Sequence, residues 1–126
     1  MKISTVTAAA LLVMAPAASA WRIRLYNWEE RNPAGGEFTK AGPGNPGSAC
    51  HDIPDSMDRK ASSMAYYATD SQSSPTTRCR LNLYDGLNCG GSAMYGIDYD
   101  VQMNLAPVSG NWGNRARSFK TTCWRI

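Results

Sequence analysis

Ile23-Arg-Leu-Tyr-Asn27 returns later in the chain as Leu81-Asn-Leu-Tyr-Asp85, at an offset of 58 residues. Apolar and polar side chains alternate in both stretches, and the alternation begins at Trp21 in the first and at Cys79 in the second. A period of two residues is typical of a half-buried strand. The chain also contains 11 glycines and 7 prolines, which favour frequent turns and short elements. These features predict an all-β fold.

The repeat extends beyond these two strands. Gly35-Gly36 lies over Gly90-Gly91 at an offset of 55, so the first copy has three additional residues in this loop. Further on, Ser62-Ser63 lies over Arg117-Ser118 at the same offset. One copy alone is too small to bury a sheet face. We therefore expect two sheets that pack face to face around one shared core.

The first twenty residues have the features of a secretory signal peptide. Lys2 is followed by an apolar stretch over residues 6–17, and Ala18-Ser19-Ala20 provides the small residues that a signal peptidase accepts. A membrane-spanning helix needs about 20 apolar residues, whereas this stretch is shorter and contains Pro16. We therefore expect residues 1–20 to be removed as the protein is exported.

The remaining 106 residues fit a single domain. We place a first motif at about 21–67, a linker rich in serine and threonine at 68–77, and a second motif at about 78–126. All four cysteines follow the signal peptide, and an even number in an oxidising compartment indicates two disulfides. Three pairings are open for these four residues, Cys50, Cys79, Cys89 and Cys123.

Two short motifs resemble those of the βγ-crystallin family. The first hairpin of that family carries an aromatic residue, four residues, a second aromatic residue, one residue and a glycine that can adopt positive φ. The stretch from Tyr84 to Gly91 is similar, with Cys89 in place of the second aromatic residue. The family's other motif is Asn/Asp, Asn/Asp, two variable residues, Ser/Thr and Ser, which residues 58–63 and 113–118 resemble. The resemblance implies a two-sheet Greek-key sandwich of βγ-crystallin type.

The resemblance also implies a disulfide pairing that the sequence alone leaves open. In that family, the first and last strands of a motif are antiparallel neighbours. Cys79 would then lie beside Cys123, because these residues belong to the first and last strands of the second motif. Cys50 would pair with Cys89 and tie the two copies together across the sandwich.

Many members of the resembled family bind calcium through the Asn/Asp and Ser/Thr positions of the second motif type. This chain departs from that pattern at Arg59 and Arg117, where a guanidinium offers only donors and repels a cation. Ser62 and Asn114 remain as calcium candidates, in one site formed across both copies. Otherwise, the serines of these stretches are interpreted as turn and strand residues that hold the backbone. No other cofactor is predicted.

The chain lacks a recognisable set of catalytic groups. His51 is the only histidine, and its neighbour Asp52 would point to the opposite face of a strand. The sequence contains no GxSxG turn and no CxxC pair that would favour a zinc site. A ribonuclease would need an acid and a base beside an arginine. We therefore predict that the protein is not an enzyme.

Removal of Lys2 with the signal peptide lowers the formal charge from +3 to +2, which is too small to indicate a nucleic-acid or membrane partner. Two loops, at residues 28–36 and 41–47, and a basic cluster near the C-terminus are candidate binding surfaces. Two tryptophans in turn-like contexts favour an interface, although the alternative for both is a place in the core. The candidate residues are Trp28, Glu29, Glu30, Arg31, Trp112, Arg115, Arg117 and Lys120.

These features predict a secreted, monomeric protein that binds an extracellular protein or a cell-wall component. Small secreted members of the resembled family include killer-toxin-like antifungal proteins and an inhibitor of metalloproteases. Disulfide-held loops suit such recognition, because they lose little entropy on binding. The predicted role is that of an antimicrobial protein or a secreted effector. The alternatives are a protease inhibitor, a calcium-stabilised structural protein and a ribonuclease.

Overall fold

The computed structural model describes residues 19–70 and 72–126. The signal peptide expected at residues 1–20 therefore lies almost entirely outside the described residues. Within the described ranges, no helix is long and apolar enough to span a membrane. The described residues form seven strands and three short 3-10 turns, which are β1 Trp21–Tyr26, η1 Glu29–Arg31, η2 Pro33–Gly35, β2 Glu37–Gly42, β3 Gly47–Asp52, β4 Ser63–Tyr67, β5 Thr77–Tyr84, η3 Leu87–Cys89, β6 Val101–Asn104 and β7 Ser118–Arg125.

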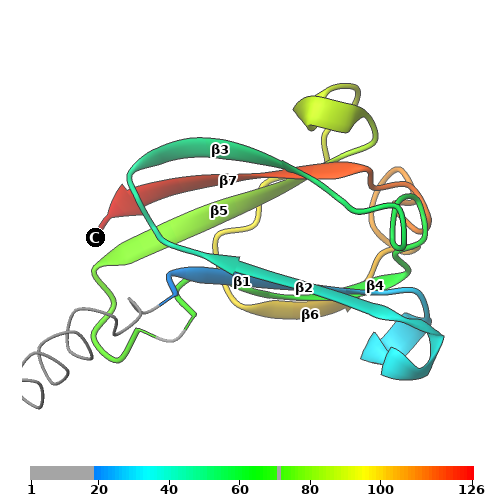
Figure 1. Cartoon of the computed structure of the whole chain (residues 1–126), viewed down its shortest axis with the longest axis horizontal. Helices are drawn as coiled ribbons and strands as arrows, with labels where there is room; N and C mark the ends of the chain where they lie inside the picture. The colour runs from blue at the N-terminus through cyan, green and yellow to red at the C-terminus, as the bar shows by residue number, and fades with distance from the viewer. Residues whose placement is uncertain (1–18, 71) are drawn as a thin grey trace, which may run out of the picture.

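The strands form two antiparallel sheets, which lie in two layers (Figure 1). One sheet has the strand order β2-β1-β4-β6, and the other has the order β3-β7-β5. The repeated strands β1 and β5 lie in different sheets. Along the free edge of β5, the described residues form two isolated bridges, Leu81 with Ile97 and Tyr84 with Ala93. The prediction of an all-β fold with two sheets is confirmed.

The third strand of each copy lies in the sheet of the other copy. β3 of the first copy pairs with β7, so that Gly47 lies opposite Cys123. β6 of the second copy pairs with β4, so that Asn104 lies opposite Ser63. The loop that carries the chain from β2 to β3 is limited to residues 43–46, which is shorter than the sequence suggests. Each sheet is completed by an edge strand of the other copy, so the two copies are interlocked.

The core between the layers is built from the alternating apolar residues of the repeat. Ile23 and Leu25 of β1 and Leu81 and Leu83 of β5 have no exposed surface. The residues that alternate with them retain exposed surface along most of both strands. Phe119 of β7 is also fully buried in this cluster. The period of two residues thus correctly indicated which face of each strand is buried.

Two disulfides join Cys79 to Cys123 and Cys50 to Cys89, the pairs that the resemblance implied. The first connects directly opposed residues of β5 and β7 inside the core. The second connects β3 to η3 and so joins the two copies. One expectation is corrected: the second disulfide does not cross the sandwich, because β3 already lies in the sheet of the second copy.

Replacing both cysteines of either pair with alanine should lower the free energy of unfolding by roughly 2–4 kcal/mol. The two cross-links span similar sequence separations, 44 and 39 residues, so their entropic contributions should be alike. The Cys79→Ala/Cys123→Ala variant should nevertheless lose more, because both side chains are in the core. Urea unfolding monitored by tryptophan fluorescence measures both losses. A larger loss in the Cys50→Ala/Cys89→Ala variant would contradict this ranking.

Candidate functional site

Two folded hairpins of the same geometry follow β1 and β5. In the first, Glu30 and Arg31 adopt left-handed backbone conformations, with φ of 59° and 55°. In the second, Asn88 and Cys89 do the same, with φ of 55° and 57°. A later glycine with positive φ completes each hairpin, at Gly36 and Gly91. The three additional residues of the first copy are accommodated as η2, which the second copy lacks.

One buried serine fixes each hairpin. The Ser63 hydroxyl donates to the Trp28 carbonyl at 2.7 Å and accepts from the Arg31 amide at 2.9 Å. The equivalent Ser118 hydroxyl donates to the Gly86 carbonyl at 2.6 Å and accepts from the Cys89 amide at 2.9 Å. Neither serine has exposed surface. These serines therefore hold the backbone, and they do so at the positions that the sequence motif marks.

A side chain from the exchanged third strand also binds each hairpin. The Glu30 amide donates to Asn104 Oδ1 on β6 at 2.8 Å, and the Asn104 side chain donates to the Glu30 carboxylate at 2.8 Å. At the equivalent place, the Asn88 amide donates to Asp52 Oδ1 on β3 at 2.8 Å. Glu30 and Arg31, which the sequence suggested as binding residues, thus also stabilise the hairpin. Arg31 in addition pairs with Glu30 at 3.2 Å.

The first Asn/Asp position of copy one is occupied by an ion pair. Asp58 accepts from Arg117 Nε at 3.1 Å and from Arg117 Nη2 at 3.3 Å. Arg59 Nε lies 3.6 Å from the same carboxylate, and the Asp58 side chain is only 14% exposed. Two guanidinium groups therefore lie where a cation would need free oxygens. Arg117, a predicted binding residue, is thus paired within the protein.

The pseudo-equivalent place in the other half brings Ser62 and Asn114 together. The Ser62 hydroxyl donates to Asn114 Oδ1 at 3.3 Å. Asn114 and its counterpart Arg59 both have left-handed φ, of 57° and 56°. The structure thus joins the two residues suggested as calcium candidates. Among residues 19–70 and 72–126, however, no group of three His, Cys, Asp or Glu side chains is arranged to hold a metal ion.

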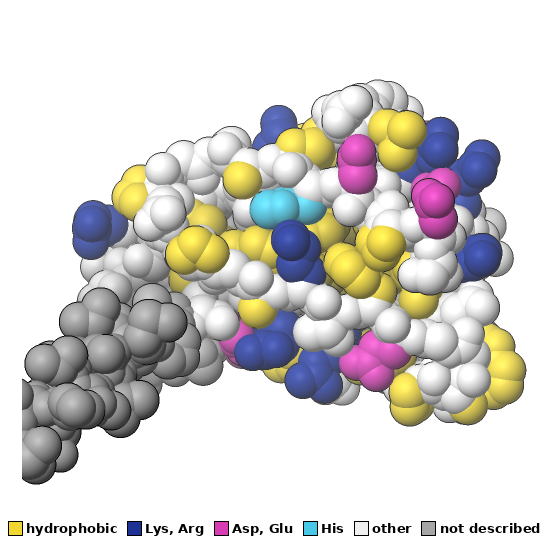
Figure 2. All heavy atoms as spheres, in the orientation of Figure 1, with side chains coloured by type: hydrophobic (Ala, Val, Ile, Leu, Met, Phe, Trp, Pro, Cys, Tyr) yellow, Lys and Arg dark blue, Asp and Glu magenta, His cyan; other side chains and the backbone are white. Residues whose placement is uncertain are grey.

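An open cleft of about 480 Å³ lies over this pair and extends to the first hairpin. Trp28, at the start of that hairpin, has half of its surface exposed. Hydrophobic side chains are visible at the end of the molecule where η1 and η2 lie (Figure 2). We call this the Trp28 cleft; it is lined by Asn27, Trp28, Glu29, Ser62, Ala106, Asn111, Gly113 and Asn114.

Three other predicted binding residues are placed differently. Trp112 is only 3% exposed and belongs to the core, so its assignment to an exposed interface is wrong. Arg115 lies over the Trp112 ring, 4.3 Å from its centroid, and pairs with Asp85 at 3.0 Å. Lys120 lies 5.5 Å from the centroid of the Tyr84 ring. The basic cluster therefore offers fewer free cations than its sequence suggests.

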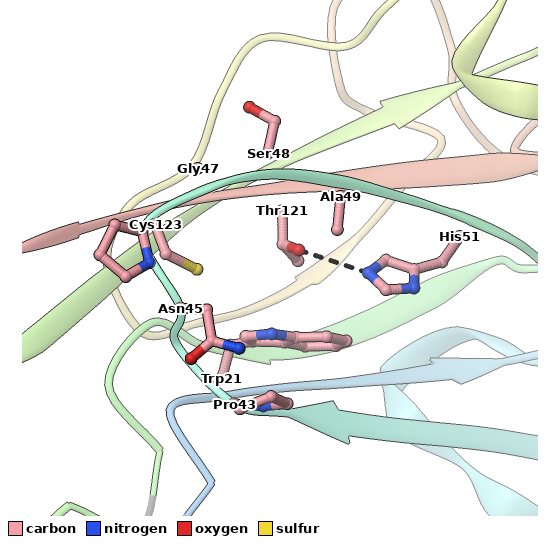
Figure 3. Close-up of a pocket in the computed structure, with 10 residues that line it drawn as sticks. Trp21, Pro43, Asn45, Gly47, Ser48, Ala49, His51, Thr121 and Cys123 are labelled. Atoms are coloured by element: carbon pink, nitrogen blue, oxygen red, sulfur yellow. Dashed lines mark hydrogen bonds between the residues drawn. The ribbon is translucent and has the colours of Figure 1, made fainter.

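A second cavity, of about 260 Å³, is lined by Trp21 of β1, by β3 and the loop before it, and by Thr121 and Cys123 of β7. Figure 3 shows the Trp21 indole close to the His51 ring, which forms a hydrogen bond with the Thr121 hydroxyl. His51 also stacks on Phe119 with ring centroids 4.9 Å apart. Asp52 lies on the opposite face and binds η3 instead, as expected for neighbours on a strand. Sequence reasoning missed this cavity, because it depends on how Trp21 of one sheet approaches β3 and β7 of the other.

Ser63→Ala and Ser118→Ala should each lower the free energy of unfolding by about 1–3 kcal/mol, because each leaves a partly buried amide and a carbonyl without a partner. The two losses should be similar, since the hydrogen bonds are equivalent. Urea unfolding provides the measurement, and Ser109→Ala at an exposed loop position is the control. Losses no larger than that of the control would show that these hydroxyls do not fix the hairpins.

The stability of the protein should fall as the pH is lowered from about 7.5 to 5.5. Burial, with a smaller contribution from the charge of Lys40, lowers the pKa of His51. The contribution of neutral His51 to the free energy of unfolding is therefore complete above the ordinary imidazole pKa of about 6.5. It is lost as the pH falls below this value toward the lowered pKa of the folded protein. His51 is the only histidine, so His51→Gln should flatten the dependence of the unfolding midpoint on pH. An equal slope in the variant would contradict the assignment.

The Trp28 cleft combines an exposed aromatic ring with amides, a hydroxyl and one carboxylate. A small number of polar groups around an apolar surface suits the non-covalent binding of a ligand. Comparisons with models of protein families, with curated proteins and with solved structures found no match for the chain.

Proposed function

We propose that this protein is a secreted, non-catalytic binding protein of βγ-crystallin type, which recognises an extracellular target through the Trp28 cleft. The role we propose is that of an antimicrobial protein or a secreted effector. The observation that carries the proposal is Trp28 itself, a half-exposed tryptophan on a hairpin that the buried Ser63 hydroxyl holds in place. Tryptophans of this kind are favoured anchors at binding interfaces.

The duplication and the two-sheet arrangement support the assignment to the βγ-crystallin type. Each copy contributes two or three strands to one sheet and its third strand to the other. The two hairpins repeat the same left-handed residues and the same serine hydrogen bonds. The serines occupy the last position of the motif through which the chain resembles that family. A duplicated motif with a serine at this position is thus common to the chain and the proposed type.

Export is supported by two features. Two disulfides cross-link the domain, as is usual in oxidising compartments. β1 begins at Trp21, the residue that would become the N-terminus after removal of the signal peptide.

The arrangement of His51 supports a non-catalytic role. Its ring contacts the rings of Phe119 and Trp21 and forms a hydrogen bond with the Thr121 hydroxyl. Burial lowers the pKa of His51. Asp52 is engaged on the other face of β3. The histidine thus contributes to packing at the sheet edge, where it is separated from the carboxylate that would orient a catalytic base.

Trp28→Ala should weaken binding of the fluorescently labelled protein to the surface of target cells. The expected loss is at least about tenfold in affinity, since an exposed aromatic anchor is removed. Leu87→Ala is the matched control, because Leu87 is 46% exposed on the equivalent hairpin of the other copy. Binding is measured by flow cytometry on intact yeast, filamentous fungal, bacterial and plant cells.

Growth measurements on the same panel separate the two proposed roles, because an antimicrobial protein inhibits growth and an effector binds without inhibiting it. Equal cell binding by Trp28→Ala and the unmodified protein would overturn the proposed site.

The calcium-stabilised alternative has one supporting observation, the approach of Ser62 to Asn114. A rise of the melting temperature in millimolar Ca²⁺ that Asn114→Ala removes would favour that alternative.

A further inference from the structure

We infer that the Trp28 cleft binds neutral sugar units of an extracellular glycan. This inference rests on the proposed function and specifies the class of target. It follows from three properties of the cleft: a fixed aromatic surface, unpaired hydrogen-bonding groups of both kinds, and the absence of lysine and arginine from its lining residues.

The indole of Trp28 packs against η2, the insertion of the first copy. A side chain at Gly35 would collide with the ring, so the ring packs directly on the backbone of η2. Asn27 Nδ2 donates to the Gly35 carbonyl at 3.1 Å and holds this backbone in place. The ring therefore loses little conformational freedom when a ligand covers it. A pyranose ring has a face of C–H groups that can lie against such an apolar surface, while its hydroxyls remain at the edge.

The rim of the cleft supplies both donors and acceptors. Asn111 Oδ1 accepts from the Gly113 amide at 3.3 Å, and Asn114 Oδ1 accepts from Ser62. Within the described part of the chain, the amide nitrogens of both asparagine side chains have no acceptor. The Glu29 carboxylate likewise has no hydrogen-bond or ion-pair partner among the described residues. A sugar hydroxyl can donate to this carboxylate and accept from these amides, since it is both a donor and an acceptor.

The charge and size of the cleft distinguish a neutral glycan from other ligands. The one carboxylate would repel a polyanion, and the polar rim would leave amides unpaired against an acyl chain. The volume of about 480 Å³ lies in the usual range of ligand sites, roughly 300–1,000 Å³. The cleft is thus large enough for sugar units and carries the hydrogen-bonding groups that they require.

The pseudo-equivalent place in the second copy provides an internal comparison. Gly86 stands where the first copy has Trp28, and no insertion backs the hairpin. Arg117 stands where the first copy has Ser62, and its guanidinium pairs with Asp58. One half of the duplicated structure is thus closed by an ion pair, whereas the other keeps an aromatic ring and free amides. This difference marks the Trp28 cleft as the half that can accept a ligand.

Isothermal titration calorimetry of the purified disulfide-bonded protein tests the inference. The probes are hexasaccharides of β-1,3-glucan, cellulose, chitin and mannan, and polygalacturonate is the anionic comparison. At least one neutral probe should bind, and Trp28→Ala should weaken it at least about tenfold. Trp28→Phe should retain part of the affinity, Asn114→Ala should weaken it severalfold, and Leu87→Ala should leave it unchanged. Affinity should be the same at low and high salt, because the ligand is neutral.

Three results would overturn the inference: no neutral probe binds, binding survives Trp28→Ala, or polygalacturonate binds best with a strong dependence on salt. Thermal melts of each variant show that the fold is intact, which is expected because Trp28 and Asn114 are exposed. If no glycan binds but cell binding still depends on Trp28, the glycan inference fails and the proposed function stands with a protein target. If cell binding is also independent of Trp28, both fail.

Discussion

The exchange of β3 and β6 between the two copies is the constraint on which the rest of the structure depends. Each sheet takes its final strand from the other half of the chain. The same exchange places Asn104 beside the first hairpin and Asp52 beside the second, where each side chain accepts a hydrogen bond from a backbone amide. A hairpin therefore reaches its final geometry only when the strand of the other copy is in place. Folding of the two halves should be coupled, because each hairpin needs a side chain of the other half to pair one of its backbone amides.

Within this interlocked frame, the two halves have kept the groups that hold the backbone and changed those that face solvent. Ser63 and Ser118 make the same pair of hydrogen bonds. In contrast, Ser62 corresponds to Arg117, and Trp28 corresponds to Gly86. A buried hydroxyl cannot be lost without leaving polar atoms unpaired, whereas an exposed position is free to change. The differences are therefore concentrated where a ligand could reach them.

The sequence predicts those parts of the structure that depend on local pattern. Alternation identified the buried faces of β1 and β5, and the repeat located both hairpins. The resemblance supplied the disulfide pairs. Trp112 was placed at the surface because a turn-like context says nothing of what packs over the turn, and the ring lies in the core beneath Arg115. Arg117 was identified as unsuitable for a cation, but its partner Asp58 lies in the other copy and is brought near only by the fold.

The Trp28 cleft is itself a product of the interlock, because both copies contribute to it. Trp28 and Ser62 come from the first copy, and Asn111 and Asn114 come from the second. A ligand in this cleft would therefore contact both halves, and its binding free energy would add to the stability of the closed sandwich. Gly35 supports the indole and buried Ser63 anchors its hairpin, so the aromatic surface exists before a ligand arrives. Preorganisation of this kind reduces the entropy lost on binding, which is how an open cleft with few contacts can hold a target.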